Sequence, residues 1–153
     1  YYDSDDFLIA NSGNSLRVRQ KINNLSIEYK CHKSVINNIR KCNEFKKGIN
    51  NLPYTIILSE IFSIKDDHNY NYKGNLITER TDFSIGNAIV SLDKNYYLGI
   101  IDYELEIESD SLTEIKDIHT LINLKLPTNE IGKYKRYYYR LLEWSNTNEA
   151  YIT

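Results

Sequence analysis

Residues 16–30 read LRVRQKINNLSIEYK and alternate apolar with polar side chains in two runs, 16–20 and 25–30. Alternation with a period of two is typical of β-strands that bury one face, and the asparagines between the two runs are common turn residues. The stretch therefore predicts an antiparallel hairpin. Because successive strand residues point to opposite faces, Arg17 and Arg19 would share the polar face of this hairpin.

Three later runs, 76–85, 88–92 and 100–108, show the same strand character. Gly86 and Asn87 separate the first two runs and predict a tight turn. Residues 93–99 are rich in polar residues and end in glycine, so we expect a loop before the last run. Together with the hairpin, these runs predict at least five antiparallel strands.

Helical spacing predicts a helix in the run that contains Val35, Ile36, Ile39, Cys42 and Phe45. Residues 53–61 leave two interpretations open. Their β-branched side chains favour a strand, whereas the leading proline is common in the first turn of a helix.

Two further helices are predicted toward the end of the chain. Ser111 and Glu114 have the spacing of a capping box, and apolar residues follow at helical spacing as far as Ile122. A last amphipathic helix is expected at about residues 135–145. Strands and helices in this order indicate a single α+β domain that covers residues 1–153.

The overall composition excludes several classes of protein. With 153 residues, 41% apolar residues and a net charge of −2, the chain is expected to have one core and no nucleic-acid partner. No apolar run reaches about 18 residues, so no membrane partner is expected. Cys31 and Cys42 lack metal-ligand spacing and are interpreted as reduced thiols of a cytoplasmic protein.

Charged residues are sorted between the predicted strands. Arginines alternate in the first strand, and Glu104, Glu106 and Glu108 alternate in the last. A solvated sheet face would explain any one of these strands. The sorting instead favours a site for both a polyanion and a divalent metal, because arginine pairs with phosphate oxygens and carboxylates bind hard cations.

Several motifs, in this order, resemble those of the CYTH domains, a family that includes class IV adenylyl cyclases, thiamine triphosphatases and inorganic triphosphatases. The matching pieces are YYDSDD at 1–6, GNSLRVR at 13–19, LSIEYK at 25–30, LITER at 76–80, LD to YELE across 92–106, and GKYKR at 132–136. Each motif alone is weak evidence for the family. Their order across nearly the whole chain makes the resemblance specific.

The resemblance implies an antiparallel β tunnel flanked by helices. The residues implied to bind a triphosphate are Arg17, Arg19, Lys30, Arg80, Lys133 and Arg136. The residues implied to hold Mg²⁺ or Mn²⁺ are Glu104, Glu106 and, as the weaker candidate, Glu28. Asp93 is either an acid that assists these ligands or a turn residue, and the turn is the preferred interpretation.

The chain departs from the family at its beginning. The E-x-E-x-K motif of the family's first strand has no counterpart here, and the chain opens at Tyr1 without any Met. We therefore expect that the N-terminal strand is lacking, although a degenerate and inactive member remains the alternative. A sheet without its first strand would expose an edge, so a homodimer is also considered.

The resemblance implies a metal-dependent triphosphate hydrolase that acts on tripolyphosphate or on an organic triphosphate such as thiamine triphosphate. One alternative is a cyclase that converts ATP to cyclic AMP and pyrophosphate. Another is a domain that binds a triphosphate or polyphosphate without turnover. The sequence leaves these alternatives open because nothing in it recognises the organic end of a substrate.

Overall fold

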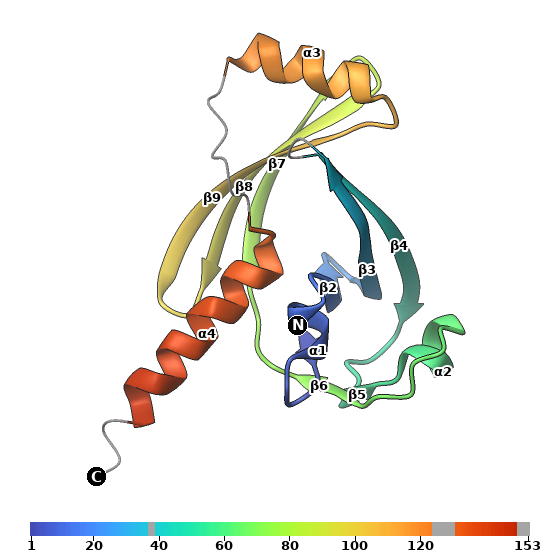
Figure 1. Ribbon diagram of the computed structural model, residues 1–153, viewed down its shortest axis with the longest axis vertical. Coiled ribbons are helices and arrows are strands. Elements are labelled where there is room, and N and C mark those ends of the chain that lie inside the picture. Colours follow the sequence, from blue (N-terminus) through green and yellow to red (C-terminus); the bar gives the residue numbers. More distant parts are fainter. Residues whose placement is uncertain (37–38, 124–130, 150–153) are drawn as a thin grey trace. The chain divides into compact units, whose positions relative to one another are not determined.

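The computed structural model describes residues 1–36, 39–123 and 131–149. The chain divides into two compact units, one formed by Tyr1–Asn75 with Asn129–Thr153 and the other by Leu76–Thr128. In Figure 1 the first unit is coloured from blue to green and in red, and the second from yellow-green to orange. The first unit has two antiparallel sheets and the second unit has one, and each unit has its own buried residues.

The main sheet of the first unit confirms the predicted hairpin. Its strands, in spatial order, are β2 (Ser15–Lys21), β3 (Asn24–Ile36) and β4 (Ile39–Ile49). Leu16 lies opposite Tyr29, and both side chains are buried on the apolar face. The turn begins one residue earlier than expected, because Ile22 adopts a left-handed φ of 53° and Asn24 already belongs to β3.

The helix predicted for the run from Val35 to Phe45 is wrong, because this run forms the end of β3 and most of β4. Phe45 lies opposite Tyr29 in the sheet, and the two rings stack with centroids 6.1 Å apart. Phe45 also packs against Phe62. Pairing with distant residues therefore outweighs the local helical spacing, and the β-branched residues of the run suit a strand equally well.

A second, smaller sheet completes the first unit. Its strands, in spatial order, are β1 (Tyr2–Asp3), β6 (Tyr70–Tyr72) and β5 (Thr55–Ile56). The unit also contains the helices α1 (Leu8–Asn11), α2 (Leu58–Phe62) and α4 (Lys133–Glu149). The ambiguous residues 53–61 thus contain both a short strand and the start of a helix. The predicted last helix is confirmed as α4, and it is longer than expected.

Asp3 fixes the start of the chain to α1 and α4. Its Oδ1 accepts hydrogen bonds from the backbone N–H groups of Ser4 and Ile9, at 2.8 and 2.9 Å. Its Oδ2 accepts from the backbone N–H of Ala10 at 2.9 Å and from the Tyr134 hydroxyl at 2.7 Å. Because a buried carboxylate is stable only with such partners, Asp3 is a structural anchor of this unit.

The second unit pairs one sheet with one helix. Its strands are β7 (Ile77–Ile85), β8 (Ala88–Tyr97) and β9 (Ile100–Glu108), in that spatial order, and its helix is α3 (Leu112–Ile122). Ser111 caps α3 as predicted, because its Oγ accepts from the backbone N–H of Glu114 at 3.3 Å. The core of the unit forms where Ala88 and Val90 contact Ile118.

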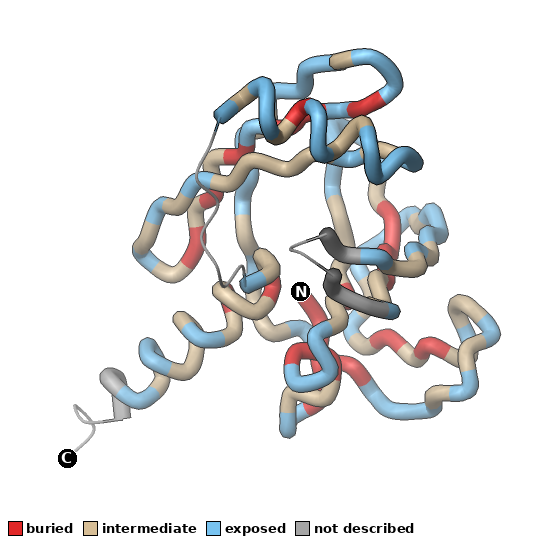
Figure 2. The backbone as a smooth tube through the Cα atoms, turned by 45° about the horizontal axis from the view of Figure 1, so that its top comes forward, coloured by how far each residue is buried: buried red, intermediate tan, exposed pale blue. Residues whose placement is uncertain are grey.

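The loop expected at residues 93–99 is wrong, because β8 extends to Tyr97 and the turn consists of Leu98 and Gly99, both with positive φ. Buried residues of this unit lie on β8 and α3 (Figure 2). Near α3 the apolar face of β8 is buried, and farther along the strand the polar side chains of Ser91, Asp93 and Asn95 are buried instead.

These elements confirm the α+β class and the antiparallel sheets. The single domain and the β tunnel remain predictions. Both cysteines are free thiols. Among the described residues, none of the helices has the length and apolarity needed to cross a membrane.

Candidate functional site

The polar face of the β2–β3–β4 sheet carries a row of charged side chains. In the register of this sheet, Glu28 on the central strand lies between Arg17 on β2 and Lys46 on β4. One rung further along the same face, Lys30 lies opposite Glu44 and forms a close ion pair with it. The predicted residues Arg17, Arg19 and Lys30 therefore lie on one face, as the alternation of their strands predicted.

Glu28 is the shared counter-ion of Arg17, Arg19 and Lys46, which are together called the basic row. Its Oε2 lies 2.7 Å from Nη2 of Arg17 and 3.8 Å from Nε of Arg19, and its Oε1 lies 3.4 Å from Nζ of Lys46. Burial alone would raise the pKa of Glu28, but Arg17, followed by Arg19 and Lys46, holds this pKa below its usual value. Glu28 therefore holds these three cations in place. Whether Glu28 also binds a metal remains a prediction.

Lys133 and Arg136 lie in the first turn of α4. The guanidinium of Arg136 donates from Nη1 to the backbone oxygen of Ile131 at 2.7 Å. The neighbouring Lys135 is turned toward α1, where its Nζ donates to the backbone oxygen of Ala10 at 3.2 Å. The predicted roles of Lys133 and Arg136 in phosphate binding remain proposals.

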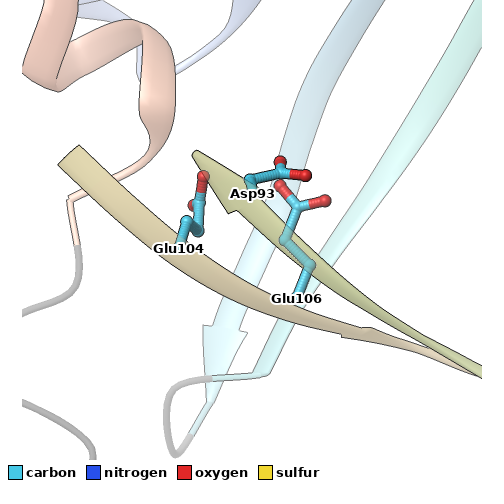
Figure 3. A group of neighbouring side chains, drawn as sticks. All are labelled: Asp93, Glu104 and Glu106. Atoms are coloured by element: carbon cyan, nitrogen blue, oxygen red, sulfur yellow. The ribbon is translucent and has the colours of Figure 1, made fainter. Parts of the chain in front are cut away.

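The second unit holds an acidic cluster of its own. Asp93, Glu104 and Glu106 each offer a carboxylate oxygen, and these oxygens lie within 4.8 Å of one another. Figure 3 shows the three side chains on β8 and β9, with the carboxylates of Asp93 and Glu106 side by side. Asp93 lies directly opposite Glu104 in the register of the sheet. The alternation of β9 places Glu104 and Glu106 on the same face, as predicted from the sequence.

Arg80 neutralises part of this acidic cluster. Its Nε donates to Oδ1 of Asp93 at 2.6 Å and its Nη2 donates to Oδ2 at 2.7 Å, while Nη2 also contacts Glu106. The hydrogen bonds with Asp93 raise the pKa of Arg80 above its usual value despite partial burial. The interpretation of Asp93 as a turn residue is therefore wrong, since its side chain is fully buried in the sheet.

The cluster fits a divalent metal by the chemistry of its donors. Carboxylate oxygens are the ligands that Mg²⁺ and Mn²⁺ prefer, and two or more carboxylates at this separation can hold one ion. Glu104 and Glu106 were predicted for this role, whereas Asp93 was considered only as an assisting acid or, preferably, a turn residue.

Two residues of the candidate site were missed for different reasons. Lys46 was overlooked because its strand was expected to be a helix. Asp93 was interpreted as a turn residue rather than an assisting acid, because Asp and Asn are common in turns and four of the five residues at 91–95 are polar.

Comparison with known proteins places the chain in a family. The family model of the CYTH domain matches residues 1–138. Among solved structures, the chain is similar to a "putative adenylate cyclase" from Bacillus halodurans, with a TM-score of 0.70 and 22% sequence identity, and the match covers 90% of this chain and 79% of that chain. A search of curated proteins found no match. The match to the family model covers most of the chain, which therefore belongs to the CYTH domain family.

Proposed function

We propose that the chain is a metal-dependent hydrolase of a triphosphate, with tripolyphosphate or an organic triphosphate such as thiamine triphosphate as its substrate. The observation that carries the proposal is the group of Asp93, Glu104 and Glu106 around Arg80, in a chain of the CYTH family. CYTH domains are metal-dependent and bind triphosphates. An acidic cluster that includes a fixed arginine suits a phosphoryl group whose charge is shared with a cation.

In this proposal the cations bind and orient the substrate. The phosphate-binding residues are Arg17, Arg19, Lys30, Arg80, Lys133 and Arg136. Guanidinium groups bind two phosphate oxygens at once, and Arg17 is held ready by its contact with Glu28. Glu104 and Glu106 would hold Mg²⁺ or Mn²⁺, which when bound polarises the terminal phosphoryl group and lowers the pKa of water.

Phosphate release tests this proposal directly. The intact protein would be incubated with tripolyphosphate, thiamine triphosphate or ATP, with Mg²⁺, with Mn²⁺ or with EDTA. We expect metal-dependent release of phosphate from at least one substrate. We also expect a loss of at least about a hundredfold in Glu104→Gln, because removing a metal ligand should cost more than removing a residue that only orients a ligand. Glu79→Gln on β7 is a control, because this exposed carboxylate lies outside the acidic cluster. Release that persists in EDTA would contradict the proposal.

A cyclase is the second candidate. The similar structure from Bacillus halodurans bears that name, and the same charged residues would also suit attack of a ribose hydroxyl on the α-phosphorus of ATP. The assay distinguishes the two, because a cyclase forms pyrophosphate and cyclic AMP from ATP without releasing phosphate.

A non-catalytic triphosphate-binding domain is the third candidate, since Arg17 and Arg19 on one sheet face would also bind a polyanion without a metal. It predicts binding of tripolyphosphate in EDTA and no turnover with any of the three substrates.

A further inference from the structure

Lys46 extends the basic row onto the third strand of its sheet. The chain brings it there through cross-strand pairing, because Lys46 lies opposite Glu28, which in turn lies opposite Arg17. The contact of its Nζ with Oε1 of Glu28 shows that the side chain points to the polar face. None of the sequence motifs that resemble those of CYTH domains includes Lys46.

Lys46 differs from Arg17 in how firmly it is held. Arg17 makes two contacts with Oε2 of Glu28, at 2.7 and 2.9 Å, and its side chain is only 19% exposed. The single contact of Lys46 is 3.4 Å long, and its side chain is 67% exposed. A single long contact made by an exposed ammonium contributes little to stability, so Lys46 can leave Glu28 at small cost.

Glu28 remains well partnered when Lys46 turns away. Arg17 still contacts its Oε2, and the Ser26 hydroxyl donates to its Oε1 at 3.3 Å. Turning Lys46 toward an anion therefore leaves no buried carboxylate without a partner. The ammonium group brings three donors and a full positive charge, which suits the non-bridging oxygens of a phosphate.

We propose that Lys46 is a further triphosphate-binding residue, which exchanges its contact with Glu28 for a contact with a phosphate oxygen of the substrate. This inference rests on the proposed function, because it concerns the same substrate and the same basic row. Arg17 and Arg19 bind from one edge strand of the sheet, and Lys46 binds from the other edge strand.

Lys47 provides a matched control on the same strand. It has the same charge and the same length, and it is also exposed. It lies opposite Ile27, which is buried on the apolar face, so it occupies the other face of the sheet. Substitution of either lysine by glutamine changes the net charge equally, but only Lys46 lies beside Glu28.

Calorimetric titration with tripolyphosphate in EDTA tests the inference without turnover. We expect Lys46→Gln to weaken binding roughly tenfold, the effect of losing one hydrogen bond between charged groups. Lys47→Gln is expected to stay within about twofold of the unsubstituted protein, and Lys46→Arg to retain most of the binding. The loss in Lys46→Gln should shrink at about 0.5 M salt, because dissolved ions screen an exposed charge.

Three results would overturn the inference, and they differ from one another. Equal losses in both glutamine variants would mean that only the overall charge matters. Unchanged binding in Lys46→Gln would exclude a contact with the phosphate chain. No binding of tripolyphosphate by the unsubstituted protein in EDTA would overturn the inference, whereas the proposed function is decided separately by the phosphate-release assay with metal. Matching melting temperatures of the two glutamine variants, within about 2 °C, would show that a loss of binding does not come from unfolding.

Discussion

The guanidinium of Arg80 contacts both carboxylate oxygens of Asp93, with Nε to Oδ1 at 2.6 Å and Nη2 to Oδ2 at 2.7 Å. The two residues lie directly opposite each other on β7 and β8. The side chain of Asp93 is fully buried, whereas that of Arg80 is 24% exposed. The pair therefore fixes one arginine beside Glu106 and at the same time neutralises a carboxylate that has no access to water.

Arg80→Ala is expected to destabilise the protein by about 3 kcal/mol, because it leaves the buried carboxylate of Asp93 without its cation. Urea unfolding monitored by circular dichroism measures this change. Glu79→Ala, on the opposite face of the same strand, should cost less than about 1 kcal/mol. The double variant Arg80→Leu with Asp93→Leu should recover most of the lost stability while abolishing activity. Additive losses in the double variant would contradict a direct pair.

The same residues show what the sequence could and could not predict. The hairpin at residues 16–30 was predictable because both its alternation and its turn are local, and that alternation placed Arg17 and Arg19 on one face. Asp93 was not assigned, because its partner Arg80 lies on another strand and local composition there suggests a turn. Cross-strand pairing also decides the strand that carries Lys46, against a helical spacing.

Glu28 should make stability depend on pH. Its pKa in the folded protein lies below the value of about 4.3 expected for an unfolded chain. A lowered folded-state pKa adds stability that is fully present above the unfolded pKa and is lost as the pH falls through the folded value. We therefore expect the difference in unfolding free energy between the unsubstituted protein and Glu28→Gln to be constant from pH 7 to about pH 5 and to shrink below about pH 4.3.

Urea unfolding of both proteins at several pH values between 7 and 3 checks this expectation. Glu28→Gln serves as the reference because it retains every other carboxylate of the chain. A difference that grows toward pH 3 would show that the cations around Glu28 do not favour its charged form.

Asp3 is expected to be essential for the packing of α1 and α4. In Asp3→Asn, an amide nitrogen would face the backbone N–H of Ala10, which would lose its acceptor in a buried place. We expect a loss of about 2 to 3 kcal/mol, the cost of a buried donor left without a partner. Tyr134→Phe removes one of the five hydrogen bonds to Asp3 and should cost about 1 kcal/mol. Thermal unfolding of the two variants would test this order, and a larger loss in Tyr134→Phe would contradict it.

Gly74 is required where the chain passes close to Tyr137 of α4. Its φ is +135°, and a Cβ at this position would lie 1.9 Å from the hydroxyl oxygen of Tyr137 and 3.2 Å from Cζ. Tyr137 cannot easily move away, because it is buried, its hydroxyl donates to the backbone oxygen of Lys73 at 3.0 Å, and its ring lies 5.3 Å from that of Tyr1. Both the backbone conformation and the close approach therefore exclude a side chain.

Gly74→Ala is expected to cost at least about 2 kcal/mol, the sum of an unfavourable φ and overpacking. Gly48→Ala, where a Cβ meets nothing within 4 Å, should change stability by less than about 0.5 kcal/mol. Tyr137→Phe removes the oxygen that the new Cβ would meet, so adding it to Gly74→Ala should recover about 1 kcal/mol relative to additive losses. A full recovery would mean that the close approach alone requires glycine, whereas no recovery would assign the requirement to φ.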